Sequence, residues 1–175
     1  RQNTNNNGIN TVNWQIYTNS EYGFEIKYPE NWQYLQRSSH DNTPFSVEFM
    51  DDPSYYEYGG AALPGMYPEK FFSAVLYKTT KTLDDYFEEF GSKNFEYKKE
   101  TLISGKRAII TKGAFKNVSG KITKEKVDMN AYTKKGDYIY IFTSMQDKES
   151  DIQEMIKTFN TILTSVKFTN PWKVY

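Results

Sequence analysis

The sequence predicts an α+β domain in which a twisted antiparallel β-sheet packs with two main amphipathic α-helices. Three observations support this prediction. Short runs of alternating apolar and polar residues recur along the chain, with Gly, Pro, Asn or Asp between them. Two segments, near residues 83–90 and 152–166, instead repeat apolar residues at helical spacing. The whole chain has 175 residues, which fits one domain with an ordinary core.

The first 13 residues are predicted to be a flexible polar tether, and residues 14–175 a single domain. The leader is rich in asparagine and poor in apolar side chains, and the sequence starts at Arg1 rather than methionine. We therefore interpret the chain as a processed or truncated product, for which a missing signal peptide is uninformative. A tether before a compact domain is typical of an anchored lipoprotein, although a frayed terminus or cloning remnant explains the same residues equally well.

The strand within Tyr22–Trp32 has the clearest alternation in the first half of the chain. Gly23 permits a sharp turn into this strand, and Pro29 ends it because proline has no N–H group for a ladder. Trp32 is expected to cover one end of the core. The side chains predicted to point inward are Phe24, Ile26 and Tyr28.

Period-two patterns predict further strands on both sides of this one. The first has Trp14, Ile16 and Thr18 in alternation, and the segment 32–37 places Trp32, Tyr34 and Gln36 on one side. Two later strands have Phe45, Val47 and Phe49, and then Phe72, Ala74 and Leu76, facing inward. Two hairpins follow, pairing 97–103 with 107–115 across Ser104–Lys106, and 126–134 with 138–144 across Gly136 and Asp137.

Both helices carry end signals. Thr82 is the predicted N-cap of the first helix, whose apolar face is Leu83, Tyr86, Phe87 and Phe90, and Gly91 ends it. Ser150 and Gln153 have the spacing of a capping box for the second helix. The apolar stripe of that helix consists of Ile152, Met155, Ile156, Phe159, Ile162, Leu163 and Val166.

The string Tyr-Gly-Phe-x-Ile-x-Tyr-Pro-x-x-Trp at residues 22–32, followed much later by a C-terminal helix with Ile162, Leu163, Ser165, Val166 and Phe168, resembles the PsbP-like family. The resemblance runs from about Trp14 to Phe168 and implies an α/β/α sandwich. That family includes the extrinsic photosystem protein, bacterial lipoproteins of unknown role and, more distantly, the Ran-binding Mog proteins. Its motif is more specific for fold than for function.

Composition excludes several classes of function. Lys plus Arg and Asp plus Glu each number 22, so no net field attracts nucleic acid or an anionic membrane. The absence of cysteine removes disulfides, thiolate catalysis and sulfur-ligated zinc. No run approaches the roughly 20 apolar residues of a membrane span. No cofactor is expected.

Candidates for catalysis are few. The one histidine, His40, lies in a polar loop segment without a second histidine to share a metal, and no G-x-S-x-G string is present. Asp51 and Asp52 close a strand and could act with His40 in a hydrolase or a metal-dependent enzyme. The acidic residues of the first helix, Asp84, Asp85, Glu88 and Glu89, are better explained by the helix dipole and a solvated face.

The segment 50–70 is the candidate contact surface, because it combines glycine and proline with clustered tyrosines. Tyrosines on loops provide large contact areas at low entropic cost. Packing of these tyrosines on their own sheet is the alternative. The candidate ligand- or partner-binding residues are Asp51, Asp52, Tyr55, Tyr56, Tyr58 and Tyr67.

A basic stretch formed by Lys116, Lys121, Lys124 and Lys126 with Arg107 is interpreted as a solvated hairpin tip, with an acidic cell-wall polymer or lipid head groups as the alternative ligands.

These observations lead to the hypothesis of a non-enzymatic, extracytoplasmic binding or assembly module, the soluble part of a lipid-anchored bacterial surface lipoprotein. Its partner would be an unknown protein or an envelope polymer, with no nucleic acid and no metal. One alternative is carbohydrate or envelope-polymer binding through the tyrosine-rich segment. Another is the hydrolase or metal-dependent enzyme using Asp51, Asp52 and His40. A cytoplasmic regulator like Mog is disfavoured.

Overall fold

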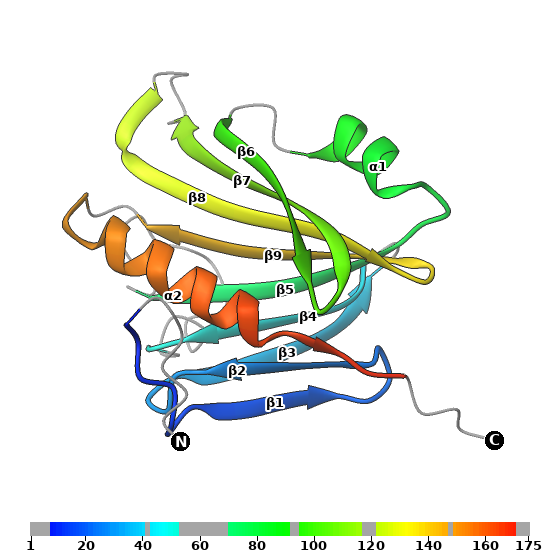
Figure 1. Cartoon of the computed structure of the whole chain (residues 1–175), viewed down its shortest axis with the longest axis horizontal. Helices are drawn as coiled ribbons and strands as arrows, with labels where there is room; N and C mark the ends of the chain where they lie inside the picture. Colours follow the sequence, from blue (N-terminus) through cyan, green and yellow to red (C-terminus); the bar gives the residue numbers. More distant parts are fainter. Residues whose placement is uncertain are drawn as a thin grey trace.

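The computed structural model describes residues 8–40, 43–52, 70–91, 95–116, 122–146 and 149–170. Its strands and helices follow the chain in the order shown in Figure 1. They are β1 (Gln15–Asn19), β2 (Phe24–Tyr28), β3 (Gln33–His40), β4 (Thr43–Met50), β5 (Phe71–Lys78), α1 (Leu83–Phe90), β6 (Phe95–Ile103), β7 (Lys106–Lys116), β8 (Ile122–Lys135), β9 (Tyr138–Gln146), the 3₁₀ turn η2 (Glu149–Asp151), α2 (Ile152–Ser165) and β10 (Lys167–Phe168).

The strands form two sheets, where the sequence predicted one. Seven strands form an antiparallel sheet in the order β3-β4-β5-β9-β8-β7-β6, and β1, β2 and β10 form a smaller sheet. The division occurs at Pro29, where the chain leaves β2 through a turn in which the Trp32 amide donates to the Pro29 carbonyl at 3.0 Å. β3 then pairs with β4 and not with β2.

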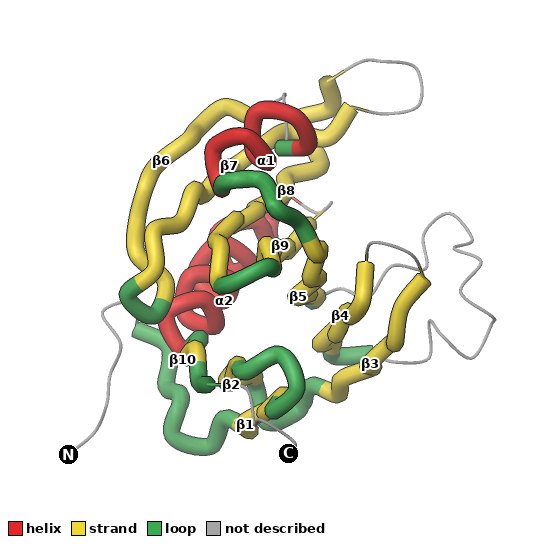
Figure 2. Tube along the Cα trace, turned by 90° about the vertical axis from the view of Figure 1, so that its right-hand side faces the viewer, coloured by secondary structure: helices red, strands yellow, loops and turns green. Residues whose placement is uncertain are grey.

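The main core lies between the two sheets and α2. Phe24, Ile26 and Tyr28 of β2 are all buried, as the alternation predicted. Figure 2 shows the large sheet curving around α2, with the small sheet closing the lower side. The same core contains the inward residues of β4 and β5, namely Phe45, Val47, Phe49, Phe72, Ala74 and Leu76.

β1 presents the face opposite to the one predicted. Tyr17 and Asn19 are buried, whereas the Ile16 side chain is 58% exposed. Tyr17 packs edge-on against Phe49, with ring centroids 5.5 Å apart, and its hydroxyl donates to Gln36. Because neighbouring side chains of a strand point to opposite faces, the burial of Tyr17 leaves Ile16 facing solvent.

The two helices pack on opposite faces of the large sheet. Buried α2 residues join the same cluster as Tyr140 and Phe142 of β9, whereas Leu83, Tyr86 and Phe87 of α1 pack with Ile139 of β9. Adjacent residues of one strand point to opposite faces, so the helices cannot share a face.

Helix α1 has the predicted cap and end, but a narrower apolar face. The Thr82 hydroxyl accepts from the Asp85 amide, and Gly91 ends the helix by donating its amide to the Phe87 carbonyl. A Cβ at Gly91 would lie 2.4 Å from that carbonyl oxygen, so no larger residue fits without a shift. Phe90, predicted to face the core, is 57% exposed, and its ring packs against Tyr86 of the same helix with centroids 5.0 Å apart.

Helix α2 begins differently from the prediction. Its N-cap is Asp151, which makes no side-chain cap bond, and the Ser150 hydroxyl donates to the Asp151 carboxylate. The predicted capping box of Ser150 and Gln153 is therefore wrong, because η2 precedes the helix and moves its start by one residue. The buried residues of α2 are Ile152, Met155, Phe159, Thr161, Ile162 and Leu163.

Both predicted hairpins are present. β6 pairs with β7 across Ser104 and Gly105, which have φ values of 49° and 76°. β8 pairs with β9 across Gly136 and Asp137, and Gly136 has a φ of 58°. These left-handed backbone conformations match the twist of two-residue hairpins. Among the described residues, no helix combines the length and the apolar composition needed to cross a bilayer.

Candidate functional site

Asp51 and Asp52 lie at the end of β4, at the base of the tyrosine-rich segment. The Asp51 amide donates to the Lys70 carbonyl at 3.3 Å, and the Lys70 amide donates to Asp51 Oδ1 at 3.1 Å. These two bonds join the ends of the segment where β4 and β5 pair. Tyr55, Tyr56, Tyr58 and Tyr67, the remaining predicted contact residues, lie outside the described residues.

The base of this segment is also attached to α2. Lys70 Nζ forms an ion pair with Glu154 Oε1 at 2.7 Å. The hydrogen bond that Lys70 donates to Glu154, with smaller contributions from the charges of Asp51 and Asp151, raises the pKa of Lys70. Since both side chains of the pair are about half exposed, this ion pair is worth little in stability, but it fixes where Lys70 lies.

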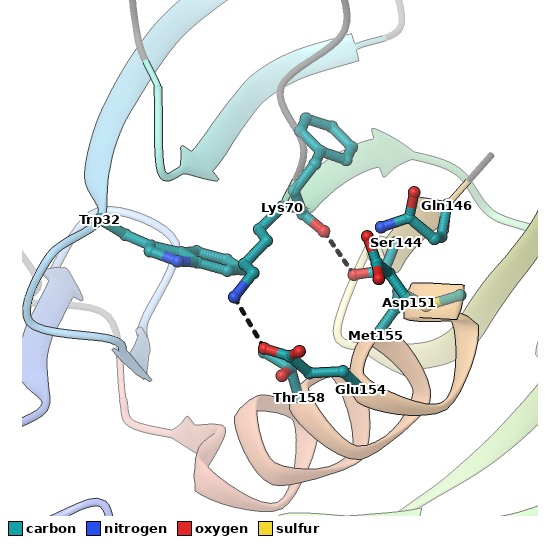
Figure 3. A pocket seen from close by; sticks show the side chains of 9 residues that line it. Trp32, Lys70, Ser144, Gln146, Asp151, Glu154, Met155 and Thr158 are labelled. Atoms are coloured by element: carbon teal, nitrogen blue, oxygen red, sulfur yellow. Dashed lines mark hydrogen bonds and ion pairs between the residues drawn. The ribbon is translucent and has the colours of Figure 1, made fainter. Parts of the chain in front are cut away.

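A hollow opens beside this ion pair (Figure 3). Trp32, the Lys70 side chain and Glu154 lie around it in the close view, with Gln146 and Asp151 on the β9 and α2 side. The Ser144 hydroxyl closes one wall by donating to the Phe71 carbonyl at 2.6 Å. The lining residues are Trp32, Lys70, Phe71, Ser144, Gln146, Asp151, Glu154, Met155 and Thr158.

The hollow is too small to enclose an organic ligand. Its volume is about 20 Å³, which holds roughly one water molecule. Sites that enclose small molecules are typically about 300–1,000 Å³. Its lining of one indole ring, two carboxylates, one ammonium group, a side-chain amide and hydroxyls provides both hydrogen-bond donors and acceptors. This chemistry suits contact with a polar group at the surface.

The structure does not assemble the predicted catalytic residues. Asp51 is committed to the backbone of Lys70, and the loop segment after His40, residues 41–42, lies outside the described residues. His40 ends β3 and pairs with Thr43 at one end of the β3–β4 hairpin, whereas Asp51 and Asp52 follow Met50 at the other end. In the described ranges, no cluster of three His, Cys, Asp or Glu side chains could hold a metal ion.

Arg107 does not belong to the predicted basic stretch. It lies near the start of β7, at the opposite end of that strand from Lys116, and its guanidinium binds Asp84 and Glu100. The four lysines of that stretch have side chains outside the described residues. Asp84, predicted to be explained by the helix dipole, also has this specific partner.

No local pattern in the sequence pointed to the residues that surround the base. Lys70 and Glu154 are separated by 84 positions, so no local spacing relates them. Trp32 was assigned to the core, and it is 4% exposed, yet its ring also lines the hollow.

Two sheets with one helix on each face of the larger sheet define an α+β domain. The comparisons with solved structures show that this fold is PsbP-like. The chain matches the cyanobacterial PsbP (CyanoP) of Synechocystis sp. PCC 6803 with a TM-score of 0.60 and 13% identity, covering 92% of this chain and 95% of that one.

Two further solved structures have the same fold. LpqN of Mycobacterium tuberculosis, described as involved in cell envelope biogenesis, matches with a TM-score of 0.54 and 13% identity over 89% of this chain and 90% of that one. A protein from Bacteroides thetaiotaomicron VPI-5482 matches with a TM-score of 0.53 and 11% identity over 90% of this chain. The match covers 49% of the Bacteroides chain. No protein-family model and no curated protein sequence matches this chain.

Proposed function

We propose that this protein is a non-enzymatic, extracytoplasmic binding or assembly module of a bacterial cell envelope. The fold shared with LpqN, a protein described as involved in cell envelope biogenesis, supports the compartment. The tyrosine-rich segment 53–69, together with the base formed by Asp51, Asp52 and Lys70, is the proposed contact surface.

One observation carries this proposal. The base of the segment is tied to β5 by two backbone-linked bonds and to α2 by the Lys70–Glu154 pair. Binding residues are often placed on loops that a rigid scaffold positions. Because Asp51 and Lys70 hold the two ends of the segment together at the sheet, less freedom of those ends remains to be lost on binding.

The experiment is a binding measurement on an envelope fraction and on a glycan panel. Tyr56→Ala and Tyr58→Ala are expected to weaken binding, because each removes a large aromatic contact. Tyr97→Ala is the matched control, since Tyr97 is a 44% exposed tyrosine on β6. Equal binding by the wild type and both loop variants would overturn the role of the segment.

The binding partner distinguishes the main proposal from the carbohydrate alternative. A protein partner is expected to be captured from the envelope fraction by the wild type and lost in Tyr56→Ala. An envelope glycan is expected to saturate the purified protein and to change its tryptophan fluorescence, and this change should be lost in Trp32→Phe, because that ring lines the hollow at the base. The small volume of the hollow favours a surface contact over an enclosed sugar.

The enzymatic alternative uses Asp51, Asp52 and His40. It requires turnover that Asp52→Asn abolishes while the folded structure is retained. A broad panel of hydrolase substrates, assayed with and without divalent metals, tests it. Absence of turnover across that panel would leave the binding module as the better proposal.

The proposed lipid anchor is tested in the encoding gene, by reading the codons upstream of Arg1. A signal peptide followed by a cysteine at its cleavage site would support the lipoprotein. A methionine start with no apolar segment would overturn the extracytoplasmic location and favour a cytoplasmic regulator.

A further inference from the structure

A second, larger groove lies away from the hollow, where the chain crosses from β5 to α1. Its volume is about 380 Å³. Figure 1 shows the start of α1 on the same side of the molecule as the β8–β9 turn. The groove is lined by Thr80, Lys81, Thr82, Leu83, Asp84, Lys106, Arg107 and Lys134.

Two of the four cations in this groove are already neutralised. Arg107 binds Asp84 through two bonds of 2.8 and 2.9 Å and Glu100 through two more of 2.7 and 3.0 Å. Lys81 pairs with Glu89 at 2.7 Å. Among the described lining residues the acidic one is Asp84, and its charge is compensated by Arg107.

The other two cations, Lys106 and Lys134, have no carboxylate partner within the part of the chain that the structure describes. Lys134 Nζ donates to the carbonyl oxygens of Thr79, at 3.3 Å, and Lys81. The surplus charge of the groove therefore comes from Lys106 and Lys134.

The wall of the groove is fixed before any ligand binds. The Thr79 amide donates to the Asp137 carbonyl at 2.8 Å, which ties the crossover to the β8–β9 turn. The Lys134 side chain binds the same connection between β5 and α1, because its ammonium group donates to the carbonyl oxygens of Thr79 and Lys81. The amides of Leu83 and Asp84, in the first turn of α1, have no acceptor within the helix and add donors to this wall.

From this arrangement we propose that the groove binds a phosphate group through the ammonium groups of Lys106 and Lys134. Lysine acts as a point-charge ligand for phosphate, and two lysines without carboxylate partners suit a dianion better than a neutral ligand. The open volume admits the sugar, glycerol or alkyl group that carries the phosphate. The same chemistry is offered by a soluble phosphate ester and by a phospholipid head group.

The experiment is an NMR titration of the whole chain with inorganic phosphate, with sodium chloride at matched ionic strength as the reference. Phosphate is expected to shift the amides of Thr80, Thr82 and Lys106 in a saturable way, while chloride does not. Lys106→Gln is expected to weaken binding about tenfold, as the loss of one charge-assisted hydrogen bond implies. Lys106→Arg should retain most of it.

Lys157→Gln is the matched control, because it removes the same charge from an exposed position on α2. Sedimentation with phosphatidylglycerol and with phosphatidylcholine vesicles distinguishes the two sources of phosphate. Binding to phosphatidylglycerol that Lys106→Gln reduces would identify a head group, and saturation by inorganic phosphate without vesicle binding would identify a soluble ester. Equal shifts with chloride and phosphate, or equal losses in Lys106→Gln and Lys157→Gln, would overturn the proposal.

Discussion

At the scale of single residues, Arg107 makes the most specific electrostatic contacts in the described chain. Its guanidinium meets Asp84 from the start of α1 and Glu100 from the neighbouring strand β6. Hydrogen bonds from this guanidinium lower the pKa values of both carboxyl groups. One exposed side chain thereby links a helix to the edge of the sheet.

Replacing Arg107 should be visible in the acid titration of its partners. In Arg107→Gln, the pKa values of Asp84 and Glu100 are expected to rise toward their ordinary values, because the neutral amide no longer stabilises the carboxylates. A carboxyl group whose pKa is lowered by folding stabilises the folded state at any pH above its pKa in the unfolded chain, which is roughly 4. This stabilisation is lost as the pH falls through the lower pKa of the folded state. The variant should therefore lose less stability between about pH 4 and pH 2.

Side-chain carboxyl NMR titrations measure both pKa values directly. Arg107→Lys is the informative control, since it keeps the charge but cannot make the forked contact. An intermediate shift is expected there. Unchanged pKa values in Arg107→Gln would contradict the geometry described above.

A second prediction concerns Tyr140, which is 1% exposed and donates its hydroxyl to the Tyr22 carbonyl at 2.7 Å. Tyr140→Phe removes this donor and is expected to lower the free energy of unfolding by about 1–2 kcal/mol. Urea unfolding measures the change. Tyr138→Phe, at a half-buried ring for which the described structure gives no hydroxyl bond, should change it by less than about 0.5 kcal/mol.

Residue-level prediction from the sequence was reliable where alternation was unambiguous. Phe24, Ile26 and Tyr28 alternate with charged residues, and their burial was predicted. Around Ile16 both faces carry apolar or aromatic residues, so the sequence did not determine which face is buried. The buried face is the one whose Tyr17 ring contacts Phe49 of β4, a strand farther along the chain.

At the scale of elements, the two helix starts make a matched comparison. Thr82 caps α1 with a 3.1 Å bond to the Asp85 amide, whereas the Ser150 hydroxyl bonds the side chain of its neighbour. Thr82→Ala is expected to lower the free energy of unfolding by about 1 kcal/mol. Ser150→Ala should lower it by less than about 0.5 kcal/mol.

Urea unfolding of the two alanine variants tests this difference, and Thr80→Ala, just outside the helix, controls for the loss of a threonine. A larger effect at Ser150 than at Thr82 would show that the predicted capping box operates in solution after all.

The elements themselves were largely predictable, but the candidate site was only partly so. Strong alternation, a cap and a helical stripe are local signals, and they placed β2, α1, α2 and both hairpins. Asp51 and Asp52 were predicted as candidate binding residues because they adjoin the tyrosine-rich segment. Lys70 and Glu154 were missed because their meeting depends on how α2 lies against the sheet, which no local pattern encodes.

At the scale of the whole molecule, Lys135 connects the two sheets. From the end of β8 its ammonium group donates to the carbonyl oxygens of Gly23 at 2.7 Å and Thr169 at 2.5 Å, which lie side by side at one end of the small sheet. Each acceptor adjoins a strand of that sheet, so the lysine holds β2 and β10 against the large sheet. Its pKa is lowered by burial and by Lys106, which fits a partly covered position.

Lys135→Met is expected to loosen the small sheet while leaving the large one intact. Amide hydrogen exchange of Thr169, which donates to Gly23, should become about tenfold faster as the opening free energy falls. Lys167→Met, at an exposed position on β10, is the control and should leave that rate unchanged. Equal protection in both variants would argue against the connection.

The α+β class was predictable at this scale, but the division into two sheets was not. β1 and β2 were predicted as strands and pair as near neighbours in sequence, whereas Phe168 was predicted to end the C-terminal helix. In the structure α2 ends at Ser165, and Lys167–Phe168 pairs with the distant strand β2 as β10. The Pro29 turn marked an end of β2 without showing that β3 would pair elsewhere. Sequence patterns locate strands, whereas strand order depends on long-range packing.

The pairing of β2 with β10 has a consequence for how the chain reaches its folded state. Phe24 lies opposite Phe168, so the small sheet joins the beginning and the end of the domain. Contacts between distant residues form slowly, because a large loop must close before they can form. During synthesis, β1 and β2 must wait for residues 166–168 to emerge before their sheet is complete. The domain therefore finishes folding late, when β10, the last of the described strands, pairs with β2.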